Sequence, residues 1–370
     1  MQPLDPSGVY SPPTVINTLA GKYGTRVMTY RFDRLDEFNN YLGPIDGLVT
    51  SASVSNNALA DIKRTAKFRI LDRGPINYLK DRIKPWAMLA MRDGGKIEWP
   101  LGVFLLTTPT RVLDADGQLA RDVVAYDQLL ALTQDKVSDR YSIAAGTFYT
   151  NAIATVASNF LSSIIPSALT IPAAIEWEPG TSKLRILNDL LGAINYESAW
   201  FDEVGILRCR PYFSPSTRAV EYDYSANSLS VISGNVEQTI DLFSVPNKWV
   251  LVKTEADQAP ITGIYTNTSP TSPTSTVSRG RTIVDFRTET DAADQGTIDA
   301  KAARVAFETS QVFEEIKFMT IAMPMHSNAD VLNVGIPGLA VADKYSERTW
   351  ELPLKPGALM THTVRRVVSI

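Results

Sequence analysis

The chain has 370 residues, of which 44% are hydrophobic and 21% are charged, and its formal net charge is −4. A globular chain of this length is expected to divide into two or three domains. Its slight acidity argues against a protein that binds nucleic acid by neutralising phosphates with clustered lysine and arginine.

Residues 1–25 contain four prolines and little hydrophobic periodicity, which predicts an extended arm that needs a partner to become ordered. The first ten residues have neither the basic start nor the apolar centre of a signal peptide. No apolar run approaches the length of a membrane span. We therefore expect a soluble chain, synthesised in a cytoplasm, with no membrane span.

Residues 26–135 alternate apolar and polar side chains in short segments divided by turn residues, which predicts an all-β domain. A short helix, YDQLLALTQD, is expected at its end. The strand segments are TRVMTYRF, GLVTSASVS, RTAKFRIL, WAMLAMRD, IEWPLGVFLLT and QLARDVVAY.

The stretch 85–106 reads as a β-hairpin whose return strand is irregular. Asp93, Gly94 and Gly95 supply a tight turn, because glycine adopts positive φ without steric cost. The return strand then carries Pro100, which lacks a ladder donor, and Gly102, which lacks a side chain to pack. These residues predict a bulge or bend at a sheet edge that another subunit could pair with.

Residues 136–214 change to helical periodicity and predict a small α+β domain whose helices cover a short sheet. Ser182 is the expected N-cap of the second helix, and a hairpin is expected about residues 203–205. The expected apolar faces of the two helices are Ile153, Val156, Phe160 and Leu161, and Leu184, Leu187, Leu191 and Ile194.

Residues 215–370 return to strand patterns and predict a second β domain. Within it, the Ser/Thr/Pro-rich segment 260–282 cannot bury much apolar area, so we expect an exposed loop or an extended arm. A helix is expected from about Thr297 to Gln311, with Ile298, Ala302 and Val305 on its buried face. Three or four strands should close the chain.

The two β regions share an order of features that favours a diverged internal duplication. A Lys-aromatic strand comes first in each, followed by a proline, an apolar strand, an aspartate turn and a Trp near a Pro-Leu pair. The matched features are Lys67-Phe68 with Lys248-Trp249, Pro85 with Pro337, Asp93 with Asp343, Trp99 with Trp350, and Pro100 with Pro353.

Little in the sequence points to catalysis. The single cysteine, Cys209, lies in an apolar strand and is expected to be a packed structural thiol. The only two histidines, His326 and His362, lie outside any nucleophile motif, and we expect them at surface or half-buried positions. No zinc, Walker A or GxGxxG motif occurs. We therefore assign no catalytic, cofactor-binding or metal residues, expect no cofactor, and predict that the chain is not an enzyme.

Two β domains flanking an α+β insert, a helix before the last strands, and the ending WELPLKPGALMTHTVRRV resemble the tail hub, or baseplate hub, of tailed bacteriophages, a kind of minor tail protein. The resemblance covers the chain from about residue 26 onward. It implies a mainly β fold with two tube-like β-barrel or sandwich domains per chain. It also implies a homotrimer whose six β domains continue a hexameric tail tube.

The same resemblance implies the partners and the location. The partners are a distal tail or tail tube protein, the tape measure protein, and tip or fibre proteins. Genome DNA passes through the lumen without specific binding, and the location is the virion tail tip or baseplate, after synthesis in the host cytoplasm.

Two other functions remain open from the sequence. A receptor- or carbohydrate-binding tail-tip protein would need exposed aromatic platforms, whereas Trp86, Trp177, Trp200 and Trp249 lie in apolar surroundings and are expected in the core. A cell-wall hydrolase would need a carboxylate pair, and nothing in the sequence singles one out.

Overall fold

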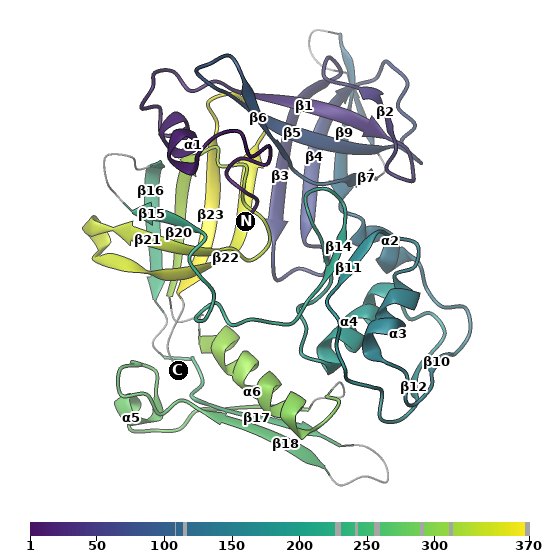
Figure 1. The fold of residues 1–370 in the computed structure, drawn as a ribbon, viewed down its shortest axis with the longest axis vertical. Helices are drawn as coiled ribbons and strands as arrows, with labels where there is room; N and C mark the ends of the chain where they lie inside the picture. The colour runs from purple at the N-terminus through teal and green to yellow at the C-terminus, as the bar shows by residue number, and fades with distance from the viewer. Residues whose placement is uncertain are drawn as a thin grey trace.

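The computed structural model describes residues 1–107, 109–113, 117–225, 231–240, 243–254, 260–288, 292–310 and 314–366. The fold is mainly β, as the alternating patterns predict. Among these residues, 15 strands belong to one large sheet, and three smaller sheets lie outside it. Figure 1 shows the large sheet above the helical α+β region and a separate layer that contains α6.

The large sheet has an amino-terminal and a carboxy-terminal half. The amino-terminal half holds β1 (Met28–Leu35), β2 (Tyr41–Pro44), β3 (Val49–Asn57), β4 (Arg64–Leu71), β5 (Arg82–Ala90), β6 (Lys96–Pro100), β7 (Phe104–Leu106), β8 (Thr110–Leu113) and β9 (Leu119–Tyr126). The carboxy-terminal half holds β15 (Tyr222–Ser225), β16 (Ile232–Ile240), β20 (Glu314–Ile321), β21 (Val331–Ile336), β22 (Val341–Pro353) and β23 (Leu359–Arg366).

The two halves meet where β22 pairs antiparallel with β3, with Leu352 opposite Val54; we call this pairing the β22–β3 seam. On one side of the seam the next strands are β4 and β9, and on the other side they are β23 and β20. Both strands at the seam continue directly into a hairpin partner, β3 into β4 and β22 into β23. The order of strands is therefore similar on the two sides, and the internal duplication stays a prediction.

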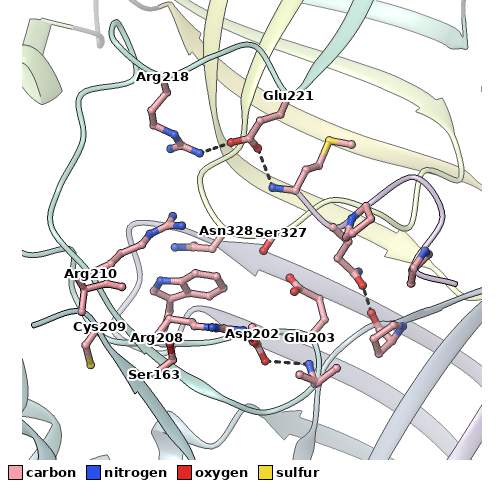
Figure 2. A pocket seen from close by; sticks show the side chains of 18 residues that line it. Ser163, Asp202, Glu203, Arg208, Cys209, Arg210, Arg218, Glu221, Ser327 and Asn328 are labelled. Carbon is pink, nitrogen blue, oxygen red and sulfur yellow. Dashed lines mark hydrogen bonds and ion pairs between the residues drawn. The ribbon is translucent and has the colours of Figure 1, made fainter. Parts of the chain in front are cut away.

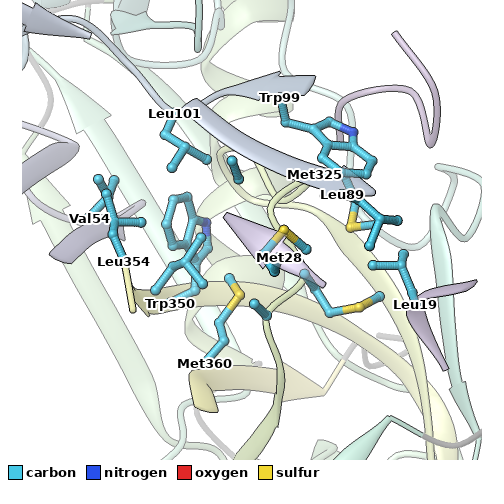
Figure 3. Packing of buried hydrophobic residues seen from close by; sticks show 14 of the residues in the cluster. Leu19, Met28, Val54, Leu89, Trp99, Leu101, Met325, Trp350, Leu354 and Met360 are labelled. Atoms are coloured by element: carbon cyan, nitrogen blue, oxygen red, sulfur yellow. The ribbon is translucent and has the colours of Figure 1, made fainter. Parts of the chain in front are cut away.

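One apolar core runs beneath both halves. Trp350, Leu354 and Met360 from the carboxy-terminal half belong to the same buried cluster as Val54 and Leu101 from the amino-terminal half (Figure 3). Burial of apolar surface is the dominant stabilising contribution in folding. Because this surface is shared, the two β halves stabilise each other across the seam.

The amino-terminal segment is ordered against its own chain, contrary to the extended arm that we expected. Helix α1 (Pro12–Leu19) has prolines in its first turn, where their missing N–H groups cost nothing, and it buries Val15 and Leu19 in the main core. Ahead of it, Gln2 donates through Nε2 to the Pro100 carbonyl at 3.0 Å. Trp99 donates through Nε1 to the carbonyl of Pro3 at 3.1 Å. The segment therefore covers strand β6.

The irregular return strand is a true break, but it lies inside the molecule. β6 ends at Pro100, Gly102 adopts φ +127°, and β7 then resumes pairing with β5 and β9. Leu101 and Val103 on either side of the glycine are 1% and 3% exposed. The predicted break at a sheet edge is confirmed, because among the described strands β6 pairs with β5 alone. The expectation that this edge is available to another subunit is wrong, because the amino-terminal segment of the same chain covers it.

The α+β region has its own apolar core and matches its expected elements. Ser182 accepts a hydrogen bond from the Arg185 backbone N–H at 3.2 Å, which caps helix α4. Leu161 is 73% exposed and lies beyond helix α3, so its predicted place on that face is wrong. The elements are α2 (Leu129–Gln134), β10 (Tyr141–Ile143), α3 (Tyr149–Val156), β11 (Ser162–Ile164), β12 (Ile175–Trp177), α4 (Lys183–Ala193), β13 (Trp200–Phe201) and β14 (Leu207–Cys209).

A third core lies between α6 (Gln295–Ser310) and the small sheet of β17 (Lys248–Lys253), β18 (Ile261–Thr266) and β19 (Val284–Thr288). Helix α6 lies close to the predicted range, and its expected apolar face is buried. The match of Lys248-Trp249 with Lys67-Phe68 is wrong, because Trp249 is in this small sheet whereas Phe68 is in the large one. Alternation of polar and apolar residues identifies a half-buried strand but does not identify its sheet.

The Ser/Thr/Pro-rich segment is more compact than the exposed loop that we expected. Asn267 donates through its side-chain amide to the Ser272 hydroxyl at 2.9 Å, and both residues are buried. Ser275 caps a short helix, α5 (Thr276–Arg279), by accepting from the Ser278 backbone N–H. Hydroxyl and amide side chains satisfy the backbone here, which lets the segment fold without an apolar core of its own.

The second predicted hairpin also differs from its match. Pro337 begins a 3-10 turn, η2 (Pro337–Leu339), between β21 and β22, and Asp343 lies inside β22 rather than at a turn. The segment of β22 from Val341 to Pro353 is one continuous strand. The turn predicted at Asp343 is therefore wrong. Asp343 is paired with Val334 of β21, so its backbone is part of the sheet.

Candidate functional site at the junction of the β halves

The only two histidines of the chain lie side by side in the interior. His326 is in the loop between β20 and β21, and His362 is on β23. Both side chains are fully buried, and their ring centroids are 5.0 Å apart. The expected surface or half-buried positions are therefore wrong. Met360, His362 and Val364 alternate on the buried face of β23, and this period-two pattern was a signal in the sequence.

Glu347 of β22 lies between the two imidazole rings. Its Oε1 is 2.6 Å from Nδ1 of His362, and its Oε2 is 2.7 Å from Nδ1 of His326. Asp330 reaches the same His326 nitrogen at 3.0 Å through Oδ2. We call these four residues the histidine cluster. They come from a loop and two strands, which the fold alone brings together.

The electrostatics of the histidine cluster follow from burial and from the two carboxylates. Burial alone would lower the pKa of His326, but Glu347 and Asp330 outweigh it and raise the pKa to about 9. Burial lowers the pKa of His362 despite the nearby Glu347. The pKa of Glu347 is lowered, because His326 more than offsets the effect of burial. Asp330 likewise has a lowered pKa, since the Met1 ammonium and His326 outweigh its burial.

A pocket of about 570 Å³ opens next to this cluster, where the amino-terminal segment, the α+β region and the carboxy-terminal half meet (Figure 2). Ser327 and Asn328, which follow His326 in the chain, line it. Its arginines are paired: Arg208 contacts Asp202 at 2.6 Å, and Arg218 contacts Glu221 at 2.5 Å. The pocket is lined by charges of both signs, and each of these arginines is already held by a carboxylate, so no built site for a charged ligand is formed.

A further ion pair ties the α+β region to the amino-terminal half. Arg64 of β4 is 1% exposed, and its Nη2 lies 2.6 Å from Oε1 of Glu203 in the β13–β14 turn. The same guanidinium donates through Nη1 to the Leu101 carbonyl at 3.3 Å. This contact fixes the turn at residues 203–205 against the break in the β6–β7 strand.

The cysteine and the tryptophans considered in the sequence lie at positions where they pack against the protein itself. Cys209 is buried on β14, and burial raises the pKa of its thiol to about 12, which keeps it protonated and unreactive. Trp177, Trp200 and Trp249 are buried, as expected. Trp86 is partly exposed, so its expected place in the core is wrong. The Arg31 guanidinium and the Lys84 ammonium lie 4.9 Å and 4.7 Å from its ring centroid.

The carboxylates of the histidine cluster do not form a hydrolytic pair. Asp330 and Glu347 have side chains that are 0% and 1% exposed, so a polysaccharide cannot reach them. In the described parts of the chain, no helix is long and apolar enough to cross a membrane.

Comparisons with known proteins identify the fold. No protein-family model and no curated protein matches the chain. Solved structures match it closely in shape. The tail protein from Neisseria meningitidis MC58 has a TM-score of 0.64 and 9% identity, over 91% of this chain and 97% of that one. The prophage MuSo2 43 kDa tail protein from Shewanella oneidensis has a TM-score of 0.61 and 10% identity, over 91% and 98%.

A third match extends the comparison to a further bacterium. Prophage tail protein gp18 from Listeria monocytogenes EGD-e has a TM-score of 0.56 and 13% identity, over 92% of this chain and 95% of that one. At these identities the likeness shows a shared fold. The chain has the fold of phage and prophage tail proteins over nearly its whole length, which confirms the resemblance seen in the sequence.

Proposed function

We propose that the protein is a structural component of a phage tail, a homotrimeric hub at the distal end that adapts a hexameric tail tube to a threefold tip. The observation that carries the proposal is the fold likeness to three tail proteins over more than nine-tenths of the chain. The matches also cover nearly all of each of those three chains.

The arrangement of the large sheet supports this role. Each chain supplies two β halves that share one sheet and one core across the β22–β3 seam. Three such chains around an axis present six β regions, which is the number that a hexameric tube requires. Because the two β halves of each chain share one core, they would keep a fixed distance from each other within the ring of six β regions.

The partners follow from the same role: a distal tail or tail tube protein on one side, tip or fibre proteins on the other, and the tape measure protein in the lumen. DNA would pass through without specific binding, because the chain carries a net charge of −4 and phosphate binding depends on cationic neutralisation. The virion tail tip or baseplate is then its location.

Neither alternative function finds support at the described residues. A carbohydrate-binding tail protein needs an exposed aromatic platform, and five of the six tryptophans of the chain are buried. A carboxylate-dependent hydrolase needs an accessible acidic pair, whereas Asp330 and Glu347 are sealed inside the histidine cluster.

The two ends of the sheet suggest how copies would meet. Among the described strands, the path ends at β2 and β16, which leaves one backbone edge of each without a partner strand. On β2, Tyr41 and Leu42 are 62% and 44% exposed. Exposed apolar residues on an open edge are typical of a strand that pairs with another chain. We expect β2 of one copy to meet the β16 end of the next.

Solution mass tests the proposal. At high concentration the untagged protein should have a mass three times its 40.7 kDa, measured by light scattering after size exclusion. Leu42→Lys should shift it to the monomer, whereas Leu161→Lys, at a position 73% exposed on the α+β region, should leave the trimer intact. A chain that stays monomeric at every concentration would contradict the trimer. A trimeric Leu42→Lys variant would contradict the β2 contact alone.

A further inference from the structure

We propose that the histidine cluster binds one structural divalent transition-metal ion of the Zn²⁺ type, with His326, His362 and Glu347 as its ligands. This site is independent of the proposed tail function. The inference begins from the sequence itself, since a chain with only two histidines brings both of them to one buried carboxylate.

The donor atoms converge on a common point. One ligand atom from each of His326, Glu347 and His362 lies within 4.8 Å of the other two. The two Nδ1 atoms face opposite oxygens of Glu347, at 2.7 Å and 2.6 Å. Donors around a tetrahedral ion with bonds of about 2.0–2.2 Å lie about 3.3–3.6 Å apart. The two nitrogen–oxygen pairs would therefore have to open by less than about 1 Å, and any pair near the 4.8 Å limit would have to close.

The hydrogen-bond pattern at His326 also favours a cation. Its Nδ1 lies close to two carboxylate oxygens, from Glu347 at 2.7 Å and Asp330 at 3.0 Å. A single N–H can direct its hydrogen at only one of these acceptors. A cation in place of this hydrogen would bind the nitrogen and Glu347, while Asp330 keeps its ion pair with the Met1 ammonium at 2.7 Å.

The opposite ring nitrogens already have the partners that metal-binding histidines require. Nε2 of His326 lies 2.6 Å from the Tyr224 hydroxyl, and Nε2 of His362 lies 2.8 Å from the Thr320 hydroxyl. A hydroxyl that accepts from Nε2–H favours the tautomer in which Nδ1 is free to coordinate. Thr320 is such an acceptor, because its own hydroxyl donates to the Ile321 carbonyl at 2.7 Å. Asp330 is held in turn by the Ser327 backbone N–H, which donates to its Oδ2 at 2.8 Å.

The donor types and the burial define the kind of ion and its role. Imidazole nitrogen with carboxylate oxygen suits Zn²⁺ and its neighbours, whereas Mg²⁺ and Ca²⁺ prefer oxygen donors only. The three ligand side chains are at most 1% exposed, which leaves no open position for substrate. The ion would therefore be structural, and it would join β22, β23 and the loop before β21.

Metal content is the direct test, because no other histidine in the chain can imitate the site. Untagged protein, unfolded in chelator and refolded with ZnCl₂, should retain about one Zn²⁺ per chain after desalting, by mass spectrometry of the metal. Refolding with CoCl₂ should give the visible absorption of tetrahedral Co²⁺ with nitrogen ligands.

Three variants separate ligands from neighbours. Glu347→Gln and His362→Gln should lose the ion and the Co²⁺ absorption, with folding checked by circular dichroism. Thr320→Val, which removes the outer contact to His362 together with the bond from the same hydroxyl to the Ile321 carbonyl, should still bind, about 10–100-fold more weakly. Wild-type protein that refolds fully in chelator and retains less than about a tenth of an equivalent of Zn²⁺ would overturn the proposal. The histidine cluster would then be stabilised by its hydrogen bonds and ion pairs without a metal ion.

Discussion

Gly102 shows how one residue fixes a turn inside the core. Its φ of +127° is strained for any residue with a side chain, and an added Cβ would lie 2.9 Å from the Phe104 ring and 3.0 Å from Cδ of Arg64. The break between β6 and β7 therefore depends on glycine for both its backbone angle and its space. The buried Arg64–Glu203 contact lies against the same turn.

We expect Gly102→Ala to lower the free energy of unfolding by about 3 kcal/mol, since backbone strain and overpacking add. Gly94→Ala is the matched control, because its φ is also positive at +85° but no heavy atom lies within 4 Å of the added Cβ. It should cost only about 1 kcal/mol. Urea denaturation followed by tryptophan fluorescence measures both. Equal losses would show that the buried contacts at Gly102 do not matter.

At the residue scale, the local sequence can indicate that a side chain is buried, but it does not indicate which residues lie next to it in space. The buried position of Cys209 follows from its apolar strand, and the inward face of His362 could have been inferred from Met360 and Val364 on either side. Nothing local places His326 beside it, because the two histidines come from a loop and a strand separated by β21 and β22. Only the strand order of the folded sheet supplies that neighbour.

At the scale of elements, periodicity predicts type and position but not pairing. Helices α4 and α6 and strands β4 and β9 lie close to their expected ranges, because each buries a clear apolar face. The sequence could not show that β17 leaves the large sheet. Helix α1 was missed for a different reason: Pro12 and Pro13 suggested an extended chain, although proline is tolerated in the first turn of a helix.

Helix α1 provides a test of whether the amino-terminal segment belongs to the core. Leu19 is 1% exposed, and we expect Leu19→Ala to reduce the free energy of unfolding by about 2–5 kcal/mol, as for other buried leucines. Val9→Ala removes apolar volume from the same segment at a site that is 72% exposed, and it should change stability by less than about 0.5 kcal/mol. Thermal unfolding measures both. If Leu19→Ala also had no effect, the segment would not stabilise the fold.

At the scale of the whole molecule, the three apolar cores do not simply follow one another along the chain, because the main core combines segments from both ends of the sequence. The main core joins both β halves, although residues 129–209 and 249–306, which supply the other two cores, come between its strands in the chain. Such a division follows from long-range pairing at the β22–β3 seam, which no local pattern reveals. It also predicts which parts of the molecule unfold together.

Two leucine variants test this division. Leu352 lies on β22 at the seam and Leu187 lies on α4, and both side chains are fully buried. Each change to alanine removes the same volume, so each should destabilise its own core by about 2–5 kcal/mol. Amide hydrogen exchange measured by mass spectrometry reports where protection is lost.

Leu352→Ala should speed exchange in β3–β5 as well as β20–β23, because the halves share one core. Leu187→Ala should speed exchange in α2–α4 and leave the large sheet protected. If Leu352→Ala affected the carboxy-terminal strands alone, the two halves would be separate folding units, and a rigid pair of β regions in each subunit would lose its physical basis.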